Sequence, residues 1–179
     1  VESRGLGDVY KRQSHLRQKD KDDKLGILDV RVLLNNKEQI DIEIQVTSSE
    51  YWVERTLFYL GKMFVDQLKP GEDYQKLEKC IHVGILNFTL FDDEEYYSRF
   101  HFWSDQGRKM YSDKYEIHTL ELPKLAKHEY PETELLKWLQ FINAETEEEF
   151  EMAAEKSEYI KKAYSLSLIH ISEPTRLDV

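Results

Sequence analysis

The sequence predicts a single α/β domain built on a mixed central sheet with helices packed against it. The first observation is a hairpin pattern over residues 25–46, where two aliphatic runs flank the polar loop 35–37. The second is the run 80–91, which is apolar on both faces, as expected of a central strand covered on two sides. Residues 50–69 between them have helical periodicity, so strand, helix and strand form a crossover unit.

Side-chain alternation separates an apolar row from a charged row on the two hairpin strands. A three-residue loop keeps the apolar residues of both strands on one face, whereas a two-residue loop would place them on opposite faces. With the longer loop, Arg31 lies opposite Asp41, a favourable pair of opposite charges. We expect the apolar row to face the core. Its members are Leu28, Val30, Val32, Leu34, Ile40, Ile42, Ile44 and Val46.

The same register places Asp29 directly opposite Glu43, and like charges in that position destabilise a sheet. Such a pair is retained most easily when a cation lies between the two carboxylates. With the amide oxygen of Gln45 on the same face, these side chains offer oxygen ligands that suit Mg²⁺, or Mn²⁺ or Ca²⁺ in its place. The alternative is an ordinary solvated charged face, and the hairpin alone leaves both interpretations open.

Several separated motifs resemble one protein family. Asp29, thirteen further residues and then E-x-Q lie on a hairpin followed by a helix, a pattern similar to the core of PD-(D/E)XK nucleases. The segments LDVRV, IDIEIQ, ERTLFYLGKMF and EIHTLELPKL follow one another as in the Rpn family of recombination-promoting nucleases, also labelled transposases. The resemblance extends over about residues 24–164.

This resemblance implies a restriction-endonuclease-like fold and a Mg²⁺-dependent DNA endonuclease that promotes recombination. Asp29 and Glu43 would bind the metal and, with Gln45, form the catalytic set. Gln45 stands where the wider superfamily has lysine; this branch commonly has glutamine, which can orient a water or a ligand but carries no charge. Arg55 and Tyr59 match an arginine and a tyrosine that recur in the family, and they would contact DNA.

The two ends of the chain do not resemble the family. Residues 1–13 and 165–179 are similar to translated sequencing-adapter sequence, so we interpret them as non-native tails; the alternative is ordinary chain termini. Between them we expect a nuclease-like domain over 14–130 and a helical extension over 131–164. The nuclease-like domain is expected to be truncated, because the upstream segment of the family has no match here.

Local patterns predict the remaining elements. The helix at 50–69 has an apolar stripe of Val53, Leu57, Leu60, Phe64 and Leu68, with cap candidates Thr47, Ser48 and Ser49. Strands are expected at 99–104 and 115–122, and a helical turn at 73–79. In the extension, Pro131 suits a first helical turn, and Thr146 with Glu149 forms a capping box.

Composition limits the function classes. The 179 residues carry a formal net charge of −10, which is awkward for a DNA enzyme because phosphate contacts need lysine and arginine. Much of the acidic excess lies in 92–95 and 145–158, away from the hairpin. The sole cysteine, Cys80, argues against a disulfide scaffold and fits a cytoplasmic protein. No apolar run is long enough to predict a membrane span; DNA is the expected partner, and a homo-oligomer is left open.

A second functional hypothesis is a catalytically inactive, nuclease-like remnant that acts as a nucleic-acid or protein interaction module. The acidic balance and the unmatched upstream segment favour it. Magnesium discriminates the two hypotheses, because a remnant need not bind the ion and its stability would then not respond to it.

Overall fold

The computed structural model describes residues 9–12, 30–34 and 37–172. The chain divides into two compact units, 1–124 and 125–179, each of which is described by itself. The domain boundary expected after residue 130 and the assignment of both ends as non-native remain predictions. Within the segment 1–13, which the sequence indicates to be a non-native tail, Val9–Arg12 forms a short strand, β1.

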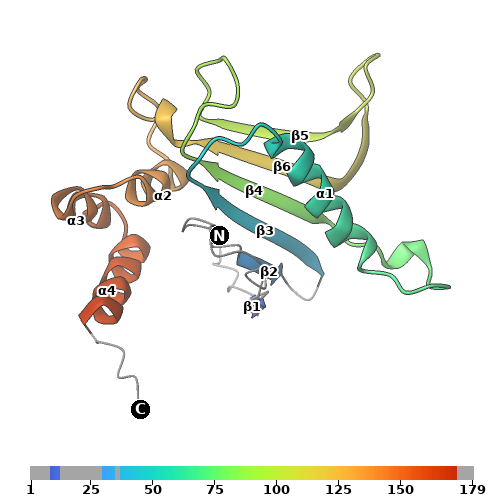
Figure 1. Ribbon diagram of the computed structural model, residues 1–179, viewed down its shortest axis with the longest axis horizontal. Helices are drawn as coiled ribbons and strands as arrows, with labels where there is room; N and C mark the ends of the chain where they lie inside the picture. Colours follow the sequence, from blue (N-terminus) through green and yellow to red (C-terminus); the bar gives the residue numbers. More distant parts are fainter. Residues whose placement is uncertain (1–8, 13–29, 35–36, 173–179) are drawn as a thin grey trace, which may run out of the picture. The chain divides into compact units, whose positions relative to one another are not determined.

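A mixed sheet of six strands, in the order β1-β2-β3-β4-β6-β5, forms the first unit (Figure 1). Strands β3, β4 and β6 are parallel neighbours, whereas β2 pairs with β1 and β3, and β5 with β6, in antiparallel fashion. The predicted α/β fold is therefore confirmed, and it is consistent with a restriction-endonuclease-like arrangement. The strands after β1 are β2 (Val30–Leu34), β3 (Glu38–Gln45), β4 (Cys80–Leu86), β5 (Tyr97–Trp103) and β6 (Met110–Glu121).

The predicted hairpin register is confirmed where the structure describes it. Leu34 pairs with Glu38 and Arg31 pairs with Asp41, and the Lys37 amide donates to the Leu34 carbonyl at 2.9 Å. The expected ion pair is not the contact made, because Arg31 Nη2 donates to Oε1 of Gln39 at 2.8 Å. The expected pairing of Asp29 with Glu43 lies outside the described residues.

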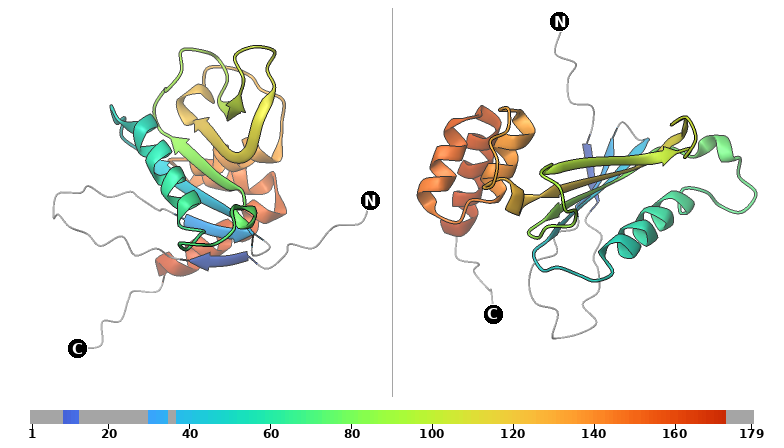
Figure 2. Two further views of the ribbon diagram at one scale, coloured as in Figure 1. Left: turned by 90° about the vertical axis from the view of Figure 1, so that its right-hand side faces the viewer. Right: turned by 90° about the horizontal axis from the view of Figure 1, so that it is seen from above.

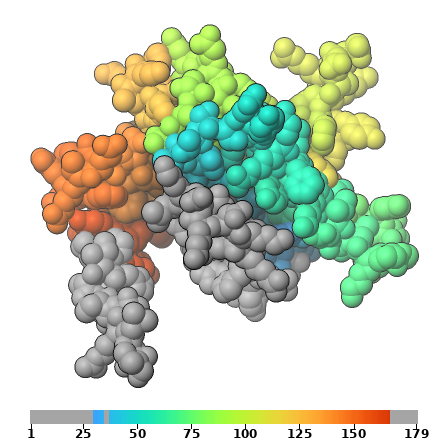
Figure 3. All heavy atoms as spheres, viewed as in Figure 1, coloured from blue at the N-terminus to red at the C-terminus, as the bar shows by residue number. Residues whose placement is uncertain are grey.

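One helix, α1 (Trp52–Val65), lies along one face of the sheet, as both views in Figure 2 show. Its buried residues are Trp52, Thr56, Leu60 and Met63. The predicted apolar stripe was therefore partly wrong, because Val53 and Leu57 are exposed. The outer side of α1 forms part of the molecular surface visible in Figure 3. The capping prediction was also wrong, because Tyr51 occupies the cap position without a side-chain hydrogen bond.

The face under α1 is the polar one. Asp41, Glu43 and Gln45 share it, and Arg55 of α1 contacts Glu43 directly. The apolar row of the hairpin lies on the opposite face, where Val30 is paired with Ile42, and its described strand residues are only half-buried. The buried Ile85 and Leu120 share that face with the row, so the expectation that the row faces the core holds in part. A further buried cluster, made by Leu60, Met63 and Cys80, lies where α1 meets β4.

The second unit consists of α2 (Glu134–Ile142), α3 (Glu147–Glu155) and α4 (Glu158–Ser172). Thr133 caps α2 by accepting from the Leu136 amide, so Pro131 precedes the helix rather than lying in its first turn. The capping box of Thr146 and Glu149 at the start of α3 is confirmed. The first helix of the C-terminal extension therefore begins after its capping residue Thr133 and not at Pro131.

Candidate active site

Glu43 is the central side chain of the polar row beneath α1. Only 2% of it is exposed, and Arg55 Nη2 lies 2.7 Å from its Oε1. Burying a carboxylate is costly unless a cation or hydrogen bonds compensate it. Arg55 supplies that compensation and so allows Glu43 to be buried here. The sequence-predicted residues Glu43 and Arg55 are thus brought together, by a strand and the helix that follows it.

Two buried polar atoms that lack hydrogen-bond partners within the described residues lie in or next to this pair, and a third lies two strands from Glu43. Within the described residues they include Gln45 Oε1, Arg55 Nε and Thr119 Oγ1. Thr119 belongs to the same transverse row, since β4 Gly84 pairs with Glu43 on one side and Thr119 on the other. Buried groups of this kind are rare in native proteins, and a concentration of them indicates a place where a ligand, ion or water completes the bonding.

Tyr59 lies one helical turn beyond Arg55 and supports it. The guanidinium carbon of Arg55 lies 5.7 Å from the centre of the Tyr59 ring, within the range of a cation–π contact. Both side chains are partly exposed, whereas Glu43, the partner of Arg55, is buried. Arg55 therefore links the buried Glu43 to Tyr59, the second residue predicted to contact DNA.

The indole of Trp52 packs on Gly84, directly beside Glu43. A β-carbon at position 84 would lie 2.6 Å from Cζ2 of Trp52, closer than real side-chain contacts allow. Only glycine therefore lets the ring lie against β4 next to the buried acid. This contact is not among the features predicted from the sequence, although a lone glycine in an apolar strand is a recognised sign of close approach.

A second buried chain of polar groups lies beside the first. His82 is fully buried, its Nδ1 lies 3.2 Å from Oδ2 of Asp41, and its Nε2 lies 3.5 Å from the Thr56 hydroxyl. Because a carboxylate only accepts, Nδ1 carries a proton and donates it to Asp41. This chain of polar groups ties β3, β4 and α1 together.

Lys124 and Glu121, from the LELPK motif, form a separate buried pair. Lys124 Nζ lies 3.0 Å from Glu121 Oε1 and 2.7 Å from Oδ1 of Asp93. Glu121 Oε2 accepts from the amide of Leu90 at 2.6 Å. These contacts fix the loop after β4 to the end of β6.

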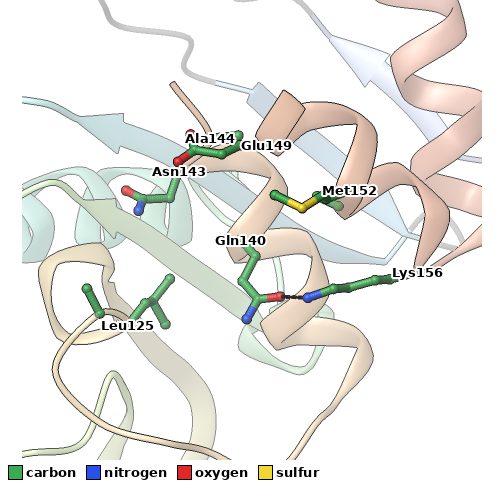
Figure 4. A pocket seen from close by; sticks show the side chains of 9 residues that line it. Leu125, Gln140, Asn143, Ala144, Glu149, Met152 and Lys156 are labelled. Carbon is green, nitrogen blue, oxygen red and sulfur yellow. Dashed lines mark hydrogen bonds between the residues drawn. The ribbon is translucent and has the colours of Figure 1, made fainter. Parts of the chain in front are cut away.

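The second unit contains a cavity of about 310 Å³, shown in Figure 4. It is lined by residues from α2, α3 and the segment before α2, and Lys156 donates to Gln140 across it at 2.8 Å. Glu149 is its only carboxylate, and that side chain already accepts from the Glu145 and Thr146 amides. The cavity therefore lacks a constellation suited to acid–base or metal chemistry.

The donor set around Glu43 fits a hard divalent cation in part. The described residues contain no cluster of three histidine, cysteine or carboxylate side chains arranged for a metal. Asp29, the second predicted acid, lies outside them. The orphaned oxygen of Gln45, on the same face as the Glu43 carboxylate, is the type of ligand such an ion takes.

A family model described as PD-(D/E)XK nuclease family transposase matches residues 7–178. No curated protein and no solved structure matches. Among the described helices, none has the length and apolar character needed to cross a membrane.

Proposed function

The chain belongs to the PD-(D/E)XK nuclease family transposases, and from this membership we propose that it is a metal-dependent DNA endonuclease whose cleavage promotes recombination. The catalytic set is Asp29, Glu43 and Gln45, with Mg²⁺, Mn²⁺ or Ca²⁺ as cofactor. The observation that carries the proposal is the group of under-bonded polar atoms around the buried Glu43. The hairpin register supports including Asp29, because Val30 pairs with Ile42, the residue before Glu43.

In this proposal Asp29, Glu43 and the amide oxygen of Gln45 hold the ion. A bound divalent ion supplies a more acidic water and stabilises charge on phosphate oxygens. The side chains of the protein provide the remaining functions. Gln45 positions a water or ligand, its amide nitrogen being anchored on the Thr47 carbonyl at 3.0 Å.

Arg55 has a double role in the proposal. Its Nη2 compensates Glu43, while its Nε is buried without a hydrogen-bond partner among the described residues. An arginine held in this way can pass from carboxylate to phosphate when DNA and metal arrive, because both anions suit its planar fork. Tyr59 keeps the guanidinium in place during that exchange.

Plasmid nicking tests the proposal. The full chain should nick supercoiled DNA with Mg²⁺ and not with chelator, and Asp29→Ala or Glu43→Ala should lower the rate at least about a hundredfold. Glu38→Ala is the matched control, since Glu38 is an exposed acid on the same strand and should leave the rate unchanged. Undiminished nicking by folded Glu43→Ala would refute the site.

The ion pair itself favours a second candidate, the inactive interaction module. Arg55 already neutralises Glu43, and a site of this kind is stable without metal. Thermal unfolding separates the candidates: an ion at ten times its Kd adds about 1.4 kcal/mol of stability to a protein that binds it. A midpoint that does not change with Mg²⁺, together with absent nicking, would support the inactive module.

A further inference from the structure

A second buried carboxylate, Glu116, lies on the sheet face opposite α1. Its neighbour Ile117 packs against the core beneath α1, so alternation along β6 directs Glu116 the other way. Glu116 is 3% exposed and binds Arg99 Nε at 2.6 Å, His118 Nε2 at 2.6 Å and His101 Nε2 at 3.2 Å. The ammonium of Lys79 forms a further ion pair with it.

Hydrogen bonds and ion pairs connect every member of this cluster to Glu116. Burial raises the pKa of Glu116, but the hydrogen bonds from Arg99 and Lys79 outweigh it and hold that pKa well below its usual range. Burial lowers the pKa of His118, so the neutral ring donates through Nε2 to the carboxylate. Its Nδ1 then accepts from the Tyr97 hydroxyl at 2.8 Å.

Arg99 is held by one nitrogen and presents the rest of its fork outward. Its side chain is 50% exposed, and within the described residues only its Nε makes a hydrogen bond. Together, Lys79 and Arg99 outnumber the single carboxylate, so the cluster is positively charged on a chain whose net charge is −10. An outward guanidinium anchored from behind by a carboxylate is suited to a phosphate.

An aromatic surface accompanies this cation on the same strand. Trp103 is 50% exposed, and its ring meets that of His101 edge-on, with centroids 6.4 Å apart. Both side chains belong to β5, the edge strand of the sheet. Arg99 and Trp103 are four residues apart on β5, about 13 Å along a strand. A fixed cation and an accessible indole on one strand form the combination with which proteins bind unpaired nucleotides, through phosphate and base respectively.

We propose that the β5 edge is a binding surface for single-stranded DNA, with Arg99 contacting a phosphate and Trp103 stacking on a base. Glu116 acts as a positioning residue that orients Arg99. The surface lies on the opposite sheet face from Glu43, so it would hold an unpaired segment of DNA away from the cleavage site. It deepens the proposed function but does not depend on metal, because none of its groups belongs to the catalytic set.

The test is binding of a fluorescent oligothymidylate by the full chain, measured by anisotropy in the presence of chelator. Trp103→Ala should weaken binding roughly five- to hundredfold, the range for loss of one stacked base. Arg99→Gln should weaken it and reduce the salt dependence by about 0.7 in log–log slope, as for one lost phosphate contact. A duplex of equal length should bind more weakly than the single strand.

Two exposed side chains outside the surface supply matched controls. Lys37→Gln removes an exposed cation and Tyr159→Ala an exposed aromatic, and neither should change the affinity. Circular dichroism and thermal unfolding identify a variant that does not fold, and Trp103→Ala, at an exposed position, keeps the test valid if Arg99→Gln fails. Unchanged affinity in folded Trp103→Ala, or preference for duplex, would overturn the proposal.

Glu43→Ala separates this proposal from the nuclease assignment. It should abolish nicking and leave oligothymidylate binding intact, because Glu43 lies on the other sheet face. Loss of nicking with normal oligothymidylate binding in Glu43→Ala is the result expected if both proposals hold. If the unmodified chain nicks DNA normally but does not bind oligothymidylate, the single-strand surface alone is overturned.

Discussion

Two buried glutamates, Glu43 and Glu116, lie on opposite faces of one sheet, and each is bound by an arginine. Around Glu116 two histidines and a lysine join the arginine, and no polar atom of the cluster is orphaned within the described residues. Beside Glu43, both Gln45 and Arg55 retain a buried atom that has no hydrogen-bond partner in the part of the chain that the structure describes. The same residue type thus serves two purposes: a saturated carboxylate stabilises structure, and an incompletely bonded environment is available for chemistry.

Glu116→Gln should give the largest stability effect of the comparison. It leaves Lys79 and Arg99 facing a neutral amide, and breaking a buried ion pair in this way costs about 3 kcal/mol or more. Urea denaturation at neutral pH measures the loss. A loss below about 0.5 kcal/mol would mean that Glu116 is no more than a surface ion pair.

The pH dependence of that loss sharpens the contrast. Because the folded protein holds the pKa of Glu116 below its usual value, its contribution is present above the ordinary carboxyl pKa. It is lost as the pH falls towards the lowered value. The difference in stability between wild type and Glu116→Gln should therefore shrink on acidification from pH 7, as urea titrations at several pH values would reveal. A difference that grows instead would contradict an ionised Glu116.

Gly84→Ala tests the other face. The added methyl would meet the Trp52 ring at 2.6 Å, and overpacking of this kind costs about 1–3 kcal/mol. Because Trp52 lies beside Glu43, nicking should fall as well, while oligothymidylate binding should not. A stable Gly84→Ala variant would show that the ring can move, and Gly61→Ala on α1, where a β-carbon meets nothing within 4 Å, is the control.

Tyr59→Leu should give the smallest effect. It keeps an apolar side chain but removes the ring from beneath Arg55, which is worth about 0.5–1 kcal/mol at a partly exposed site. Chemical denaturation should register that loss, and the nicking rate should fall only severalfold. A loss as large as that of Glu43→Ala would indicate that Tyr59 itself takes part in catalysis.

The features that could be predicted from sequence depend on nearby residues. Loop parity determined the pairing of Arg31 with Asp41, and the spacing of Thr146 and Glu149 determined a capping box, since both involve residues close along the chain. The family resemblance pointed to Glu43 and Arg55, which the helix after β3 then brings together.

The features that were missed depend on packing between distant segments. The burial of Trp52 at the start of α1 depends on the fit of its ring on Gly84, thirty-two residues later, and none of the hydroxyl residues before the helix caps it. The cluster around Glu116 joins the start of β4 to β5 and β6, and no local pattern links its members. For the same reason, the side of the sheet that α1 covers could not be derived from the hairpin alone.

The three-residue loop of the hairpin has an evolutionary consequence. A strand that shifts by one residue exchanges its two faces. Insertion of a single codon into 35–37 would therefore turn the acidic row of one strand away from its partner, whereas insertion of two codons would preserve it. Among natural variants of this chain, in-frame changes in this loop should survive selection in even numbers, and an odd change should mark a lineage in which the two strands no longer present their acidic side chains on one face.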